Sequence, residues 1–303
     1  MRYLRILQAV AGMPWAIHAE KGRMIVDFLM SKARGIDKTA EEIQAAKAMA
    51  RNEPVQDKPR QQSIAVLPVS SVILPRAHDI TDSSMGPSGG QSAEMLSRMF
   101  SRFVNDDDVS AIVLDIDSPG GAVGGVPELF ETVFAARGQK HVVAVANHFC
   151  ASAAYWLGCA AGEFVMTPSA MVGSVGVYTY HEDISQLLAD EGVKPTFISS
   201  SPEKVEDARQ HALTDGARAH LQAVVDTYAS TFIRDVARGR GVTEVDVRQN
   251  FGNGRMYQSE YAVAHNMVDR IATLDEVISG LRSDAQRRDS RMAQRRRRLA
   301  MAG

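Results

Sequence analysis

Short, almost continuously apolar runs alternate with segments of helical periodicity along most of this chain. This alternation restricts the fold more than any other feature of the sequence. The clearest runs are Ile64–Val69, Val109–Ile116 and Val142–Ala146. Strands that are apolar at nearly every position are typical of sheets covered on both faces, and helical connections between them favour parallel pairing. We therefore expect an α/β fold in which repeated β-α-β units build a parallel sheet covered by helices.

Weaker signals extend the same pattern toward the C-terminus. Three further strands are predicted at Phe164–Met166, Pro195–Ser199 and Val268–Ile271. Apolar residues at helical spacing indicate the helices that connect and cover the strands. The predicted helices are Ser92–Phe103, Pro127–Ala136, Ser152–Ala161, Asp183–Glu191, Ala217–Arg238, Val242–Phe251, Ser259–Asn266 and Leu274–Leu281.

The composition changes at residue 63 and again at residue 283, which predicts three parts. Residues 1–62 carry helical patterns at Ile25–Met30 and Thr39–Arg51, then the polar run Asn52–Gln62, and are interpreted as an N-terminal helical arm and linker. Residues 63–282 hold the predicted sheet and form the main domain. Residues 283–303 contain seven Arg against two Asp, so we expect a disordered tail that contacts scaffold or nucleic acid.

The composition is that of a globular protein, with 45% apolar and 23% charged residues. A formal net charge of −2 argues against nucleic-acid binding by the chain as a whole. No apolar stretch approaches the roughly 18 residues of a membrane span, and Met13-Pro14-Trp15 breaks the early apolar run, so we expect a cytoplasmic protein. Cys150 and Cys159 lack companions at metal-ligand spacing, which predicts core packing and no metal or cofactor.

A glycine pair follows the strand Val109–Ile116, in the turn Ser118-Pro119-Gly120-Gly121. Two interpretations have equal weight on these residues alone. The pair forms a tight turn, or it leaves backbone N–H groups bare so that they stabilise an oxyanion or a phosphate. The glycines do not have the spacing of a phosphate-binding or dinucleotide-binding loop.

Ser152 stands out because it follows the strand Val142–Ala146 in a stretch where almost every residue is apolar or tiny. On its own it is more simply interpreted as the N-cap of the next helix. However, consecutive parallel strands place their carboxyl ends at one edge of a sheet, so Ser152 and the Gly120-Gly121 turn are expected to meet there. A serine next to backbone amides is the minimum arrangement for acyl transfer.

A serine nucleophile also needs a base. None of the histidines, of which His148 is nearest in sequence, accompanies a Gly-x-Ser-x-Gly turn, so the triad of an α/β-hydrolase is not expected. A desolvated lysine can take the proton instead. Lys194 and Lys204 flank the predicted strand Pro195–Ser199, although each is by default a solvated surface lysine.

Three segments, in this order and spacing, resemble the signal peptide peptidase A family (S49) of serine peptidases. They are Asp117–Gly121, Ala151–Trp156 and Gly173–Val177. That family is similar in fold to the ClpP and crotonase proteins, so the resemblance implies a ClpP/crotonase-like arrangement. The segment Met13–His18 resembles the tailed-phage branch, whose members act as prohead (minor capsid) proteases.

The resemblance implies a Ser/Lys dyad with Ser152 as nucleophile and an oxyanion hole at Gly120 and Gly121. Counting from Ile198, the base falls on Lys204, with Lys194 as the alternative. The sequence departs from the family here, because Ser201-Pro202 replaces Gly-Lys and acidic residues surround Lys204. Substrate would lie along Gly173, Ser174 and Val175.

The resemblance implies a serine endopeptidase that cleaves phage capsid or scaffold proteins during head maturation. The expected partners are capsid, scaffold or portal proteins and further copies of the chain in a homo-oligomer, in the host cytoplasm or within the prohead. Three alternatives stay open: a host-type peptidase that degrades signal peptides, a crotonase-like acyl-CoA enzyme, and an inactive capsid component.

Overall fold

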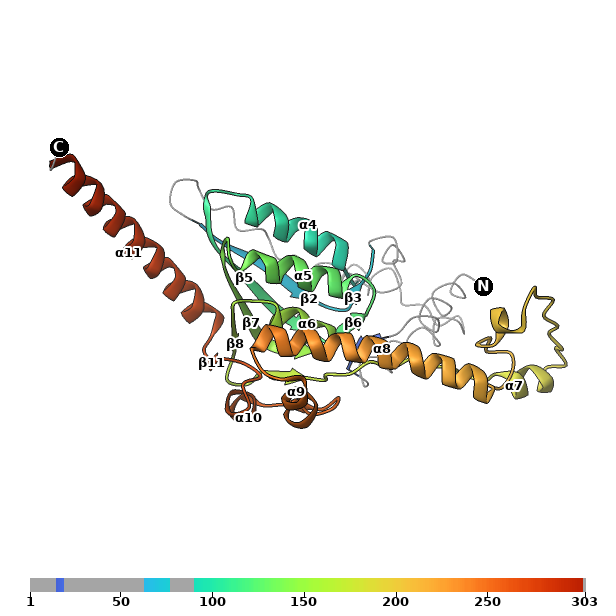
Figure 1. Cartoon of the computed structure of the whole chain (residues 1–303). Helices are drawn as coiled ribbons and strands as arrows, with labels where there is room; N and C mark the ends of the chain where they lie inside the picture. Colours follow the sequence, from blue (N-terminus) through green and yellow to red (C-terminus); the bar gives the residue numbers. More distant parts are fainter. Residues whose placement is uncertain (1–14, 19–62, 77–89, 302–303) are drawn as a thin grey trace, which may run out of the picture.

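The computed structural model describes residues 15–18, 63–76 and 90–301 (Figure 1). The predicted helices at Ile25–Met30 and Thr39–Arg51, and the linker Asn52–Gln62, lie outside the described residues. Most of the predicted N-terminal arm is therefore not described, apart from one short strand within it.

The main sheet is parallel, as the sequence predicts. Strands β2, β5 and β7 pair side by side in parallel, and the late part of β7 continues the sheet through β9. The early part of β7 pairs with β8, which in turn pairs with β11, and among the described strands of this sheet only β10 runs antiparallel. The strands are β2 (Ser63–Ser70), β5 (Val109–Ser118), β7 (His141–Ala151), β8 (Glu163–Met166), β9 (Met171–Gly173), β10 (Met256–Tyr257) and β11 (Arg270–Ile271).

A second, smaller sheet lies beyond the ends of β5 and β7. Its order is β1-β6-β3-β4, formed by β1 (Trp15–Ile17), β6 (Gly120–Ala122), β3 (Ile73–Leu74) and β4 (Gln91–Ser92). β6 is the Gly120-Gly121 turn of the sequence analysis, drawn out into a strand directly after β5. Because each strand has only two or three residues, the sequence pattern did not predict this sheet.

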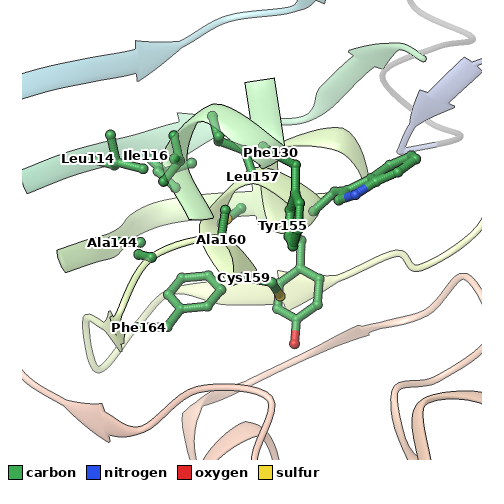
Figure 2. Close-up of a cluster of buried hydrophobic side chains, with 14 of the residues drawn as sticks. Leu114, Ile116, Phe130, Ala144, Tyr155, Leu157, Cys159, Ala160 and Phe164 are labelled. Carbon is green, nitrogen blue, oxygen red and sulfur yellow. The ribbon is translucent and has the colours of Figure 1, made fainter. Parts of the chain in front are cut away.

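Helices cover both faces of the main sheet. Helices that include α4, α5, α6 and α8 cover one face, where the inward side chains of β5 and β7 belong to the main hydrophobic cluster (Figures 1 and 2). In that layer the Trp156 ring stacks on Phe232 with ring centroids 4.4 Å apart. The other face packs on Val277 and Leu281 of the last helix. The helices are α4 (Ala93–Val104), α5 (Val126–Ala136), α6 (Ala153–Cys159), α7 (Ser185–Asp190), α8 (Asp215–Arg240), α9 (Glu244–Asn250), α10 (Ser259–Ala264) and α11 (Leu274–Met301).

Two predictions about the secondary structure are wrong. Residues Pro195–Ser199 do not form a strand. They are exposed on a projection that reaches beyond the sheet with α7, and no strand of the described residues pairs with them (Figure 1). The last helix does not end at Leu281, and residues 283–301 are helical rather than a disordered tail. This extension has neither Gly nor Pro and is rich in Arg, Ala, Gln and Met, which favour helix.

Among the described residues, no helix is long and apolar enough to span a membrane.

Candidate active site

Ser152 lies at the junction where β7 ends and α6 begins. β7 extends to Ala151 because its late residues pair with β9 on one side and with Ser118 of β5 on the other. The Ser152 backbone then turns sharply, with φ 55° and ψ −119°. A non-glycine residue with positive φ is strained by about 1–3 kcal/mol, and such strain clusters at functional sites. Ser152 is thus held in a strained turn between the strand and the helix.

The capping interpretation of Ser152 is wrong, because its side chain makes no cap hydrogen bond to α6. Its backbone carbonyl accepts the first helical hydrogen bond, from the Trp156 N–H at 2.8 Å. The hydroxyl instead donates a long hydrogen bond of 3.5 Å to the Gly176 carbonyl. The residue is 1% exposed, so the hydroxyl lies at a buried position with one weak acceptor.

The segment Gly173–Val175 lies directly beside Ser152. The Ser152 N–H donates to the Gly173 carbonyl at 2.8 Å, and Ala151 pairs with Gly173 across β7 and β9. The far side of the segment is held by β10, since the Ser174 N–H donates to the Arg255 carbonyl at 2.7 Å. Ser174 has φ 55°, so a second strained serine follows the same edge.

The Gly120-Gly121 turn meets Ser152 at the carboxyl ends of β5 and β7. A Cβ placed on Gly120 would lie 2.3 Å from the Ala16 carbonyl oxygen, 2.8 Å from the Ala151 carbonyl oxygen and 2.9 Å from the Ala153 nitrogen. The φ of 95° at Gly120 is a further reason for glycine. The structure therefore brings the glycine turn against both neighbours of Ser152.

The backbone amides of this turn are not all free donors, although the sequence left that interpretation open. The Gly120 N–H donates to the Ser118 hydroxyl at 3.2 Å, and that hydroxyl donates to the Ser71 carbonyl at 2.6 Å. Gly121 is paired with Ala16 of β1 on one side and Ile73 of β3 on the other. A free donor at Gly120 thus requires the Ser118 hydroxyl to move. The Ala153 amide, which the sequence analysis did not single out, lies on the other side of the same turn.

The two lysines lie away from Ser152. Lys204 is in the short 3-10 helix η3 (Pro202–Val205), Lys194 is in the segment before it, and both are exposed. These segments belong to the projection beyond the sheet, whereas α6 lies in the middle of the molecule (Figure 1). Over the described residues, no hydrogen bond or ion pair joins either lysine to Ser152. The structure brings together Ser152, Gly120, Gly121, Gly173, Ser174 and Val175, but it does not bring Lys204 or Lys194 to them.

A groove of about 480 Å³ lies next to this site. One wall is the chain from Val177 to His181, and the other comes from Leu213 and the first half of α8. The His181 Nε2 atom is buried there without a hydrogen-bond partner among the described residues. The groove continues the edge that begins at Gly173 and Gly176.

The thiols on either side of Ser152 are unsuited to nucleophilic attack. Cys150 and Cys159 are free and buried, as the sequence analysis predicts. Burial raises the pKa of the Cys150 thiol well above its ordinary value and raises that of Cys159 to about 12. Both thiols therefore stay protonated at neutral pH, and Ser152 remains the candidate nucleophile of this junction.

A buried, strained serine beside a glycine turn, at the carboxyl edge of a parallel sheet, has the placement that a candidate nucleophile requires. Comparison with known families defines the class more closely. The model of peptidase family S49 matches residues 135–288, which include Ser152, Gly173 and the projection. The chain belongs to this family.

Relatives of the chain include two phage proteins. It is 28% identical to Capsid assembly protease C of Escherichia phage lambda over 279 residues, 90% of this chain and 62% of that protein. It is also 28% identical to Head-tail preconnector protein GP5 of Enterobacteria phage P21 over 217 residues, 71% of this chain and 42% of that protein. Protease 4 of Salmonella typhi is 29% identical over 175 residues, 57% of this chain and 28% of that protein. The chain thus spans less than two thirds of the length of these relatives.

Proposed function

We propose that the protein is a serine endopeptidase that cleaves capsid or scaffold proteins of a tailed phage during head assembly. Membership of family S49 supports the peptidase activity. The substrate class is supported by the phage lambda relative, named a capsid assembly protease, which aligns with 90% of this chain.

The observation that carries the proposal is the geometry of Ser152. A serine kept only for packing or capping would adopt ordinary backbone angles and bond its own helix. Ser152 instead has φ 55°, makes no cap hydrogen bond and directs its hydroxyl to the Gly176 carbonyl. Strain of this kind persists only where the surrounding structure holds it, which is consistent with a nucleophile.

In the proposed reaction a lysine amine takes the hydroxyl proton as the Ser152 oxygen bonds to the scissile carbonyl carbon. The carbonyl oxygen becomes negatively charged and is bound by the amides of Gly120 and Gly121, once the Ser118 hydroxyl has moved away from the Gly120 N–H, with the Ala153 amide at the same turn. The lysine then returns the proton to the leaving amine, and water hydrolyses the acyl-enzyme in the reverse sense. Each oxyanion donor contributes about 3–4 kcal/mol in comparable enzymes.

We propose Lys204 as the base, supplied by a second copy of the chain, with Lys194 as the alternative. Within one chain the projection holds both lysines away from α6 (Figure 1). The projection also exposes apolar side chains that a globular protein normally covers. These are Leu187, Val193, Phe197 and Ile198, the last of them 98% exposed. In the proposed homo-oligomer a neighbouring copy covers these side chains, and each projection brings its lysine to the Ser152 of that neighbour.

The test of the nucleophile is labelling with a fluorophosphonate probe, which bonds covalently to activated serines. We expect the wild-type chain and the control Ser169→Ala, at an exposed serine of the neighbouring loop, to be labelled. We expect Ser152→Ala to lose labelling with an unchanged circular dichroism spectrum. An unlabelled wild-type chain would support the inactive capsid component instead.

The substrate class is tested separately, by co-expression with neighbouring capsid, scaffold and portal proteins and mass spectrometry of the fragments. Fragments that appear with the wild-type chain and not with Ser152→Ala identify substrates. If only signal peptides were cut, the alternative host-type activity would replace the capsid role.

A further inference from the structure

The strand β1 occupies the edge at which an added peptide would pair. On one side it runs antiparallel to β6, with Trp15 opposite Ala122, Ala16 opposite Gly121 and Ile17 opposite Gly120. On the other side the Trp15 N–H donates to the Tyr178 carbonyl at 2.8 Å, and the Tyr178 N–H donates to the Trp15 carbonyl at 3.0 Å. An extended peptide recognised by strand addition is held by main-chain hydrogen bonds to a sheet edge, as β1 is held by β6, and the Tyr178 pair adds a contact on the other side.

The strand also leads to the nucleophile. The Ala16 carbonyl oxygen lies 2.3 Å, and the Ala153 nitrogen 2.9 Å, from the position that a Gly120 Cβ would take. Beyond β1, the His18 N–H donates to the Pro119 carbonyl at 2.9 Å, and the His18 ring packs edge-on against Phe149 of β7. β1 therefore passes the glycine turn at the point where that turn touches both neighbours of Ser152.

Side chains of β1 alternate between two environments, as in any strand. Trp15 and Ile17 are 5% and 3% exposed and fill one small cluster with Leu74 and Ala122. Ala16, fully buried, points to the opposite face and packs in the main core cluster that also contains Ala153. The channel thus accepts large apolar side chains at alternate positions with a small one between them.

The connection of β1 to the fold is indirect. It enters the smaller sheet from the N-terminal side, and residues 19–62 separate it from β2 in the sequence. No short turn ties it to either of its partners. β1 is therefore joined to both of its pairing partners only through residues that are distant in the sequence.

We infer that β1 is an exchangeable occupant of the substrate channel, which closes the site until the N-terminal segment leaves. This inference rests on the proposed function for its meaning. Substrate segments take the place of β1 as an antiparallel strand between β6 and the chain at Tyr178. They carry a large apolar, small, large apolar pattern, and their N-terminal continuation runs toward the groove along Thr179–His181.

The test locks β1 in place and measures peptide binding, with no need for cleavage. In a Ser152→Ala chain, Trp15→Cys and Ala122→Cys place two thiols at directly paired positions, where cross-strand Cβ atoms are about 4.5–5.5 Å apart. Binding of a fluorescent peptide with the sequence of residues 14–18, Pro-Trp-Ala-Ile-His, is followed by anisotropy in the oxidised and the reduced protein. We expect oxidation to weaken binding at least tenfold and reduction to restore it.

Two controls make the outcome specific. The peptide Pro-Ala-Trp-His-Ile has the same composition but places its large side chains on the opposite face, so we expect at least tenfold weaker binding to the reduced protein. The single variant Trp15→Cys should bind the peptide equally with and without reductant. Equal binding by the oxidised and reduced double variant, or no binding by either, would show that β1 is a permanent strand and overturn the inference.

Activity then separates this inference from the proposed function. If the peptide exchanges with β1 but the wild-type chain is neither labelled by fluorophosphonate nor able to cut protein, the channel assignment stands and the peptidase proposal fails. If the wild-type chain is labelled and cuts protein, but the oxidised and reduced double variants bind the peptide equally, only the channel assignment fails.

Discussion

The nucleophile region and the projection are built in opposite ways. Ser152, Gly120 and Gly173 come from three separate turns, and backbone pairing between strands holds them together at buried positions. The projection around α7 and η3 is exposed at every residue from 191 to 200. One chain therefore brings Ser152 and its glycine segments together, whereas it keeps Lys204 and Lys194 on the exposed projection, away from Ser152.

The largest effect is expected from replacing Ser152, the candidate nucleophile. We expect Ser152→Ala to abolish proteolysis, a loss of up to about 10⁶-fold by analogy with other serine peptidases. The fold should persist, because the side chain makes only one long hydrogen bond. Cleavage of a co-expressed capsid substrate, quantified by mass spectrometry, measures this loss. Residual cleavage above background would assign the nucleophile to another residue.

The next effect addresses the projection. Removing a general base lowers the rate by about 10²- to 10⁴-fold, so we expect a loss in that range for Lys204→Ala and little change for Lys194→Ala. The same cleavage assay measures both variants. The reverse ranking would move the base to Lys194.

Mixing variants tests whether the lysine comes from a neighbour. Ser152→Ala and Lys204→Ala chains are each inactive alone, but a mixed oligomer contains sites that combine an intact serine with an intact lysine. We therefore expect co-expressed or re-assembled mixtures to recover part of the wild-type activity. If such mixtures formed oligomers but stayed inactive, each site would draw both residues from one chain.

The same contrast explains what could be predicted from the sequence. The meeting of Ser152 with Gly120 follows from the apolar strands Val109–Ile116 and Val142–Ala146, because parallel neighbours share a carboxyl edge. Lys204 was placed by counting from a strand at Pro195–Ser199 that does not exist, since a short apolar run without a partner strand stays exposed. The three residues of β1 are too few to show an alternating pattern, and their pairing with Gly120–Ala122 is remote in sequence.

A smaller effect is expected from replacing Gly120 with alanine. The same replacement at Gly192 distinguishes the cost of backbone strain from the cost of steric overlap. Gly120 and Gly192 both have positive φ, 95° and 70°. A Cβ on Gly120 would meet backbone at 2.3 Å, whereas a Cβ on Gly192 meets nothing within 4 Å. We expect Gly120→Ala to lower the free energy of unfolding by about 1–3 kcal/mol through overpacking and to reduce fluorophosphonate labelling at least tenfold.

The matched variant Gly192→Ala introduces the backbone strain of positive φ without a steric overlap. An alanine in this region of backbone space costs roughly 1–2 kcal/mol, and on the projection that cost affects local order only. We expect labelling of Ser152 to stay at the wild-type level, as measured by gel fluorescence. Equal losses of labelling in both variants would mean that labelling of Ser152 depends on the local order of the projection, in the same chain or in a neighbour.

The smallest effect concerns the strain stored at Ser152. Glycine populates positive φ without the steric penalty, whereas alanine keeps it. Relief of the strain stabilises Ser152→Gly, whereas the larger unfolded-chain entropy of glycine offsets part of that gain. We therefore expect Ser152→Gly to be more stable than Ser152→Ala by a net difference of about 1 kcal/mol. Thermal unfolding in the presence of excess reductant measures the difference as a shift of about 2–4 °C. Should Ser152→Gly unfold at the lower temperature, the positive φ would not be a strained state. Backbone strain would then no longer support Ser152 as the nucleophile.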